Sequence, residues 1–247
     1  MLEINSLTKH FDSVTAVSDL SLTVRPGEVL GFLGPNGAGK TTTMKMVTGF
    51  LTPDGGTARI CGHDIMAQTL QAQRRLGYLP EGAPAYGEMT PREFLDFIAG
   101  VRGFSGAAAI AARDQAVVHT GLESVLDRPV ETLSKGFRRR VGLAQAILHD
   151  PEVLILDEPT DGLDPNQKHT VRELIRAIAP TKTIVISTHL LDEVDAVCSR
   201  AVIIDRGRIV ADGTPAELAA RGSGGKLEDL FRTLTHGDLA DSSGAAA

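Results

Sequence analysis

Cysteine is scarce in this sequence. Only Cys61 and Cys198 occur among the 247 residues, and they form no metal-ligand pattern. A disulfide framework or a structural zinc site needs several cysteines at short, regular spacings. The sequence therefore excludes a disulfide-stapled secreted domain and is typical of a reducing compartment, which predicts a cytoplasmic protein.

Long hydrophobic runs are also missing. No stretch reaches the roughly 18 apolar residues that a helix needs to cross a bilayer. The first residues, MLEINSLTKHFD, carry acidic side chains where a signal peptide would have a basic and then an apolar stretch. If the protein acts at a membrane, we expect another polypeptide to span it.

The chain lacks an excess of positive charge. Its 25 Lys and Arg residues face 31 Asp and Glu residues, which gives a net charge of −6. This balance argues against non-specific electrostatic binding of nucleic acid, and we expect no nucleic-acid partner. The one basic run, Arg138–Arg140, falls on a predicted helix, where three charges are more typical of a solvated face than of a phosphate patch.

The distribution of apolar residues predicts an α/β fold. Short runs bounded by Gly, Pro or Asp are predicted as strands: Val29–Leu33, Val153–Leu156, Thr183–Ile186 and Ala201–Ile204. The first three are almost continuously apolar, as expected for parallel strands that helices cover on both faces. Residues 1–28 and 57–62 have the alternation of shorter strands, and Asp205–Gly207 is predicted as a hairpin turn.

Helix signals interrupt and follow this pattern. Thr90–Glu93 and Thr214–Glu217 each combine an N-cap, a proline in the first turn and a glutamate that completes a capping box. The pattern from about residue 91 to 126 is purely helical, so a helical block is expected inside the α/β core. Residues 222–225 have the composition of a linker, residues 227–234 are amphipathic, and the final dozen are expected to be disordered.

A phosphate-binding loop follows the first buried strand. The segment matches G-x-x-x-x-G-K-[ST] at every fixed position. Glycines let backbone amides turn towards a phosphate, and the following helix points its positive end at the anion. In this motif the lysine reaches the β- and γ-phosphates and the threonine hydroxyl ligates Mg²⁺, so a nucleotide with Mg²⁺ is the expected ligand. The predicted phosphate site consists of Gly34, Pro35, Asn36, Gly37, Ala38, Gly39, Lys40, Thr41 and the adjoining Thr42.

Two adjacent carboxylates end the strand at Val153–Leu156. Side chains converge on ligands at this end of parallel strands. Asp157 can hold Mg²⁺ directly or through water, and Glu158 can orient and deprotonate an attacking water. Taken alone, the pair can also be a strand end that turns polar as it meets solvent; the phosphate loop favours the functional interpretation.

In their order and spacing these motifs resemble the ABC ATPases. Residues 133–141, LSKGFRRRV, are similar to the family signature LSGGQ-x-x-R-V, with Lys at the second small position and Phe in place of Gln. Asp161–Asp164 matches the D-loop, and His189, after Ser187–Thr188, matches the switch histidine. The resemblance covers about residues 1–221. It implies a P-loop core with an antiparallel β subdomain, a helical subdomain inserted at about 88–150, and a tail at 222–247.

The resemblance also implies partners. The hydroxyl of Ser134, Lys135 and the amide of Gly136 form a second anion site, which closes over ATP bound to another subunit; Asp164 contributes from the D-loop. The chain is thus expected to pair with a second copy or a paralogous ATPase, on separate integral membrane permeases at the inner face of the cell membrane. A lone histidine such as His189 is usually structural, but in this family it contacts the γ-phosphate and helps to hold the attacking water.

Two positions depart from the usual family pattern. Phe11 stands where an aromatic, usually Tyr, stacks on adenine, although it could instead be an ordinary core aromatic. Glu81 stands where most members have Gln, and its carboxylate is an equally good hard oxygen ligand for Mg²⁺. Alternatively, Glu81 is a solvated carboxylate in a surface loop that contacts no ligand. Together, residues 78–81 (YLPE), 133–136 (LSKG) and 160–167 (TDGLDPNQ) resemble the ABC-2-type exporter branch, particularly the gliding-motility and nitrous-oxide-reductase-maturation ATPases.

Two other functions fit parts of the sequence. A soluble ABC ATPase of DNA repair or translation would act without a membrane, but such proteins carry two ATPase domains, long coiled coils or zinc-binding cysteine sets. A small-molecule P-loop kinase would leave the signature and the switch histidine without a role. The sequence therefore favours the ATPase subunit of an exporter.

Overall fold

The computed structural model describes residues 1–82 and 85–236, and its larger sheet has six strands in the order β10-β9-β3-β8-β7-β6. Strands β9, β3, β8, β7 and β6 are parallel, and β10 is antiparallel to β9. The bounds are β3 (Val29–Leu33), β6 (Leu76–Leu79), β7 (Val153–Asp157), β8 (Thr183–Thr188), β9 (Arg200–Asp205) and β10 (Arg208–Gly213). All four predicted buried strands are confirmed, with three extended by one or two residues.

The smaller sheet is antiparallel, in the order β2-β1-β4-β5. Its strands are β1 (Leu2–Phe11), β2 (Val14–Val24), β4 (Gly55–Ile60) and β5 (His63–Asp64). The prediction of short strands in residues 1–28 is wrong, because β1 and β2 have 10 and 11 residues and are longer than any parallel strand. Register shifts after Ile4 and Leu7 interrupt the alternation, so the sequence pattern divides what is one continuous ladder.

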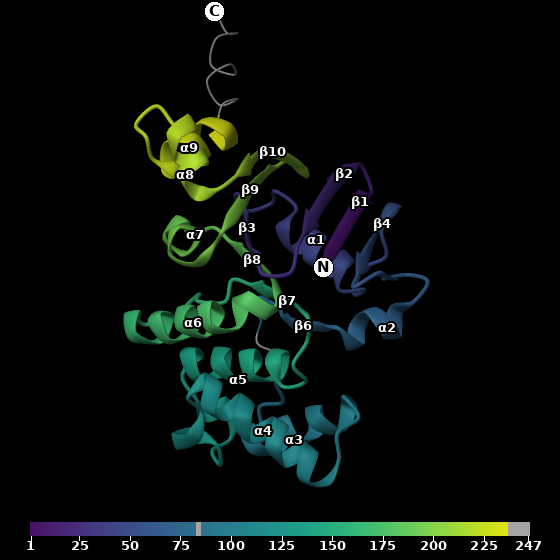
Figure 1. Cartoon of the computed structure of the whole chain (residues 1–247), viewed down its shortest axis with the longest axis vertical. Coiled ribbons are helices and arrows are strands. Elements are labelled where there is room, and N and C mark those ends of the chain that lie inside the picture. Colours follow the sequence, from purple (N-terminus) through teal and green to yellow (C-terminus); the bar gives the residue numbers. More distant parts are fainter. Residues whose placement is uncertain (83–84, 237–247) are drawn as a thin grey trace, which may run out of the picture.

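Helices cover both sheets and form a block at one end of the molecule, where α3, α4 and α5 lie together opposite α8 and α9 (Figure 1). The helices are α1 (Lys40–Val47), α2 (Thr69–Arg74), α3 (Pro91–Val101), α4 (Gly106–Thr120), α5 (Lys135–Ile147), α6 (Pro165–Ile178), α7 (Leu191–Val197), α8 (Pro215–Arg221) and α9 (Leu227–His236). Short 3-10 turns lie at Glu123–Val125, Val130–Thr132 and Ala179–Thr181. Both predicted capping boxes are present, at Thr90 and Thr214.

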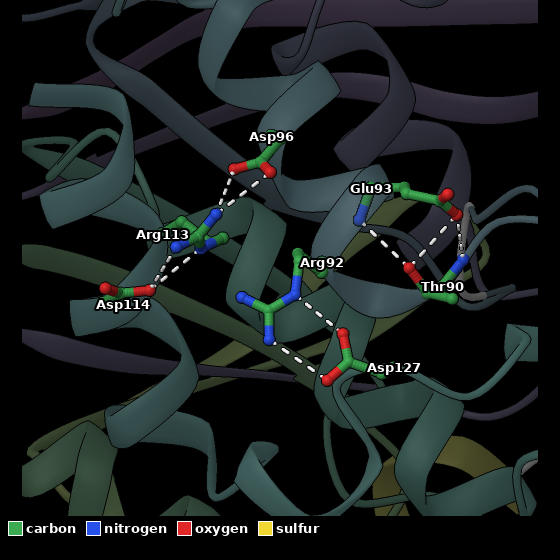
Figure 2. A network of polar contacts seen from close by, with 7 residues as sticks. All are labelled: Thr90, Arg92, Glu93, Asp96, Arg113, Asp114 and Asp127. Atoms are coloured by element: carbon green, nitrogen blue, oxygen red, sulfur yellow. Dashed lines mark hydrogen bonds and ion pairs between the residues drawn. The ribbon is translucent and has the colours of Figure 1, made fainter. Parts of the chain in front are cut away.

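The helical block has its own apolar core, in which Phe94, Leu95, Val117 and Val141 are buried together. Ion pairs surround it: Arg113 bridges Asp96 and Asp114, and Arg92 holds Asp127 through two nitrogens (Figure 2). The carboxylates of these pairs are largely exposed, so solvent screens the pairs and they contribute little to stability. Burial of the apolar side chains therefore dominates the stability of the block.

The described part of the chain ends on a helical pair. Strands β9 and β10 meet at a two-residue turn in which Arg206 and Gly207 both have positive φ, as the predicted hairpin requires. Helix α9 packs on α8 and buries Leu227 and Leu230. Residues 237–247, expected to be disordered, lie outside the described residues. Among the described residues, no helix is long and apolar enough to cross a membrane.

Candidate functional site

The phosphate loop turns tightly between β3 and α1. Gly37 and Gly39 have left-handed φ values of 82° and 100°. A Cβ atom at Gly39 would lie 2.4 Å from the carbonyl oxygen of Ala16, and one at Gly34 would lie 2.5 Å from that of Ile204. Only glycine fits these two close approaches, so the loop is pressed against β2 and β9 and its open side faces outwards.

Lys40 is buried at the start of α1. Its Nζ donates to the carbonyl oxygens of Gly34, at 2.7 Å, and Pro35, at 3.1 Å. Burial lowers the pKa of Lys40, while the carboxylates of Glu158, Asp157 and Glu81 act in the opposite direction. The lysine cation thus lies across the phosphate loop, within the field of three carboxylates.

One cavity lies between the phosphate loop and two glutamates that follow strands β6 and β7. It has a volume of 340 Å³ and is lined by Ala16, Asn36, Gly37, Gly39, Lys40, Thr41, Thr42, Glu81 and Glu158. Glu81 follows β6 and Glu158 follows β7, so residues far apart in the sequence meet at the carboxyl edge of the sheet. The exposed Glu81 is therefore not a remote surface charge.

The two carboxylates after β7 have different surroundings. Asp157 is almost fully buried, burial raises its pKa, and its Oδ2 has no hydrogen-bond partner among the described residues. Glu158 has a left-handed φ of 53°, which is uncommon for a residue with a Cβ. Its Oε1 accepts a hydrogen bond of 2.8 Å from Nδ1 of His189, while Oε2 is buried and finds no partner in residues 1–82 and 85–236. The strained turn thus separates the two acids and places Glu158 against His189.

His189 directly follows β8, the strand next to β7. Its side chain is 49% exposed, whereas that of Glu158 is 13% exposed. A satisfied structural histidine is normally enclosed by its partners. This one contacts a single carboxylate and leaves much of its ring accessible.

The donor set fits Mg²⁺ better than a transition metal. Among residues 1–82 and 85–236, no three His, Cys, Asp or Glu side chains cluster as a metal site would. The available donors are oxygens, from Asp157 with its unpartnered Oδ2, Thr41 and Glu81. Mg²⁺ typically takes one or two carboxylates together with substrate phosphates, so this sparse set is sufficient once phosphate oxygens are present.

The signature residues lie outside this cavity. Ser134 is the N-cap of α5, and its hydroxyl accepts from the amide of Phe137 at 3.4 Å. Lys135 forms an ion pair of 2.8 Å with Asp161. A Cβ at Gly136 would lie 2.2 Å from Oε1 of Gln167. Asp164 caps α6 and accepts from the amide of Gln167 at 2.9 Å, so the N-terminus of α5 and the D-loop form a second polar cluster.

Phe11 ends β1 and does not line the cavity. Its side chain is 46% exposed, and Nζ of Lys9 lies 5.6 Å from the ring centroid. The ring is therefore not part of the core, which removes the core-aromatic alternative for this residue and leaves a ring accessible for stacking.

The expectation that Arg138–Arg140 forms a solvated face is wrong for Arg139. This side chain is 4% exposed and donates to backbone carbonyls near both Glu81 and Glu158. Arg140 stacks on Phe137, 4.1 Å from the ring centroid. The helical phase carries the missed signal, since Arg139 lies four residues before the buried Leu143 and seven before the buried Ala146.

Comparison with known proteins agrees with this geometry. Residues 17–161 match the family model described as ABC transporter. Nod factor export ATP-binding protein I of Paraburkholderia xenovorans (strain LB400) is 40% identical over 231 residues, 93% of this chain and 76% of that protein. Daunorubicin/doxorubicin resistance ATP-binding protein DrrA of Streptomyces peucetius is 39% identical over 88% of this chain and 66% of that protein. A solved ATP-binding subunit of an ABC transporter has a TM-score of 0.86 at 30% identity, covering 95% of this chain and 99% of its own.

The close approach at Gly39 yields a test of the phosphate loop. We expect Gly39→Ala to lower ATP affinity at least about tenfold, because the new Cβ collides with the Ala16 carbonyl. Gly37→Ala is the matched control: it shares the left-handed φ, but no atom lies within 4 Å of its Cβ. Its loss should be clearly smaller in titration calorimetry with ATP. Equal affinities for the two variants would contradict the steric argument.

Proposed function

The chain belongs to the ABC transporter ATP-binding proteins, and we propose that it is the ATPase of an exporter, paired with a second ATPase subunit on separate membrane permeases. The proposal rests mainly on one cavity, in which the phosphate loop and Lys40 lie opposite Glu158. The carboxylate of Glu158 is in turn hydrogen-bonded to His189. Export is supported by the name of the Nod factor export relative. We propose residues 1–221 as the nucleotide-binding domain, with the helical subdomain at about 88–150.

The residues of the cavity divide the work of hydrolysis. Lys40 supplies positive charge to the β- and γ-phosphates of ATP. Thr41, Asp157 and Glu81 would hold Mg²⁺, which neutralises phosphate charge when bound. Glu158 accepts the proton of the attacking water, and the hydrogen bond from His189 fixes the orientation of that carboxylate. The exposed part of the His189 ring remains available for the γ-phosphate.

A second chain completes each site. Ser134, Lys135 and Gly136 lie at the N-terminus of a 13-residue helix, away from the cavity of their own chain. Unbonded amides and the helix dipole favour an anion there. We propose that this cluster, with Asp164, closes over the ATP of a second copy or a paralogous subunit, while Phe11 stacks on the adenine of its own ATP.

An apolar groove next to the cavity provides a surface for the permease. Two pockets of 680 and 640 Å³ adjoin there, between the core and α3. They share Phe50, Tyr78, Ile98, Arg102 and Gln145. Pro80 lines the groove and the next residue, Glu81, lines the nucleotide cavity, so the backbone at these two residues connects the groove to the nucleotide cavity. We propose that a short cytoplasmic helix of the permease binds here, which places the chain on the inner face of the cell membrane.

The catalytic assignment is tested by Glu158→Gln, which keeps the shape of the side chain but removes the base. We expect turnover to fall by at least about 100-fold, with ATP affinity within about threefold of the parent. The variant should accumulate as an ATP-bound dimer in size-exclusion chromatography. A variant that hydrolyses ATP within about threefold of the parent rate would contradict the assignment of Glu158 as the general base.

The groove is tested by two valines with nearly equal exposure, Val101 (66%) and Val118 (64%), each in the last turn of its helix. Only Val101 lines the groove. We expect Val101→Asp to abolish sedimentation of the purified chain with inverted membrane vesicles that contain the permease, because burying a charge is costly. Val118→Asp should sediment like the parent, and both should keep parental basal ATPase activity. Equal binding of the two variants would exclude this groove as the docking site.

A further inference from the structure

Arg139 connects three parts of the site from one buried position on α5. Its Nη1 donates to the carbonyl oxygens of Pro80, at 2.6 Å, and Glu81, at 2.7 Å. Its Nη2 donates to those of Asp157 and Glu158, the latter at 2.5 Å. The ends of β6 and β7 are thus bridged by a side chain from the helix that Ser134 caps.

The planar guanidinium is suited to this bridge. A charge that is 4% exposed must be offset by partners, and four carbonyl oxygens accept hydrogen bonds from its terminal nitrogens. Its Nε is buried and has no acceptor within the part of the chain that the structure describes. Burial lowers the pKa of Arg139, and the carboxylates of Asp157, Asp161, Glu158 and Glu81 counteract this shift. An arginine keeps its charge in such a setting, whereas a lysine ammonium lacks the two-pronged geometry.

The rest of α5 holds the arginine in register with β6. Gln145 donates to the carbonyl of Tyr78 at 2.7 Å, and His149, just beyond the helix, donates to that of Leu76 at 3.0 Å. A Cβ at Gly77 would lie 2.1 Å from the carbonyl oxygen of Ala146, so α5 and β6 are in direct backbone contact. Movement of α5 relative to the Glu81 loop would therefore break several contacts together.

We propose that Arg139 is a positioning residue for hydrolysis, which holds the backbones of Glu81 and Glu158 in one arrangement with the signature end of α5. The proposal rests on the proposed role of Glu158 as the general base. It predicts that Arg139 acts on the chemical step more than on ATP binding, because the phosphate loop makes none of these contacts. Arg139 would also connect two parts of the proposed dimer site. One is Ser134, proposed to face the second subunit, and the other is Glu158, the base that acts on the chain's own ATP.

The experiment compares Arg139→Gln and Arg139→Lys with Arg138→Gln. Arg138 is the neighbouring control, because its side chain makes one hydrogen bond within the described residues, a 3.4 Å contact to the carbonyl oxygen of Glu131. For each purified full chain we would measure kcat, the Kd for ATP, and amide hydrogen exchange of peptides spanning residues 76–82 and 156–162. We expect Arg139→Gln to lower kcat at least tenfold, to leave Kd within threefold, and to speed exchange in both peptides. Arg139→Lys should recover part of kcat, and Arg138→Gln should match the parent.

Several results would overturn the proposal: a kcat for Arg139→Gln within threefold of the parent, equal losses in kcat and ATP affinity, or faster exchange spread evenly over the chain. If Arg139→Gln does not fold, Arg139→Lys takes its place in the test. A loss of kcat of at least threefold, with ATP affinity kept and faster exchange confined to the two peptides, would support the proposal, and a smaller loss would overturn it. A parent protein without ATPase activity would refute the proposed function instead. The exchange of the two peptides would still test whether Arg139 holds them.

Discussion

The parallel alignment of β3, β7 and β8 is the constraint on which the site depends. These strands are neighbours in the sheet, and their register pairs Leu33 with Thr188 and Asp157 with Ser187. The carboxyl ends of parallel strands open onto one edge, so the phosphate loop, Glu158 and His189 meet there. Continuous burial of the three strands on both faces makes this edge rigid, and the phosphate loop, Glu158 and His189 are positioned from it.

Charge is concentrated and nearly matched at this edge. Two buried cations, Lys40 and Arg139, lie in the field of Asp157, Glu158 and Glu81. The two cations are used differently. Lys40 reaches across the loop, where a phosphate can attract it, whereas Arg139 is committed to backbone carbonyls and so fixes structure. Under the proposed function, Lys40 is the cation available to the phosphates of ATP, while Arg139 holds the backbone beside the cavity.

The sequence predicted the parts of this arrangement that local pattern determines. Continuous apolar runs located the strands, and glycine spacing located the phosphate loop. The length of β1 and β2 was missed because bulges interrupt their alternation. Arg139 was missed because a run of three arginines suggests solvent, although helical phase puts the middle one inside. The hydrogen bond between Glu158 and His189 joins residues 31 positions apart across two strands, so only the sheet register could reveal it.

The central claim is that each ATP site combines the phosphate loop of one chain with the signature helix of the other. Two tethered dimers with the same two substitutions test it most directly. In the first, one copy carries Ser134→Arg and the other Lys40→Ala, which leaves one intact composite site. In the second, both substitutions are in one copy, which leaves none. The account predicts ATPase activity only in the first dimer; activity only in the second would show that each chain completes its own site.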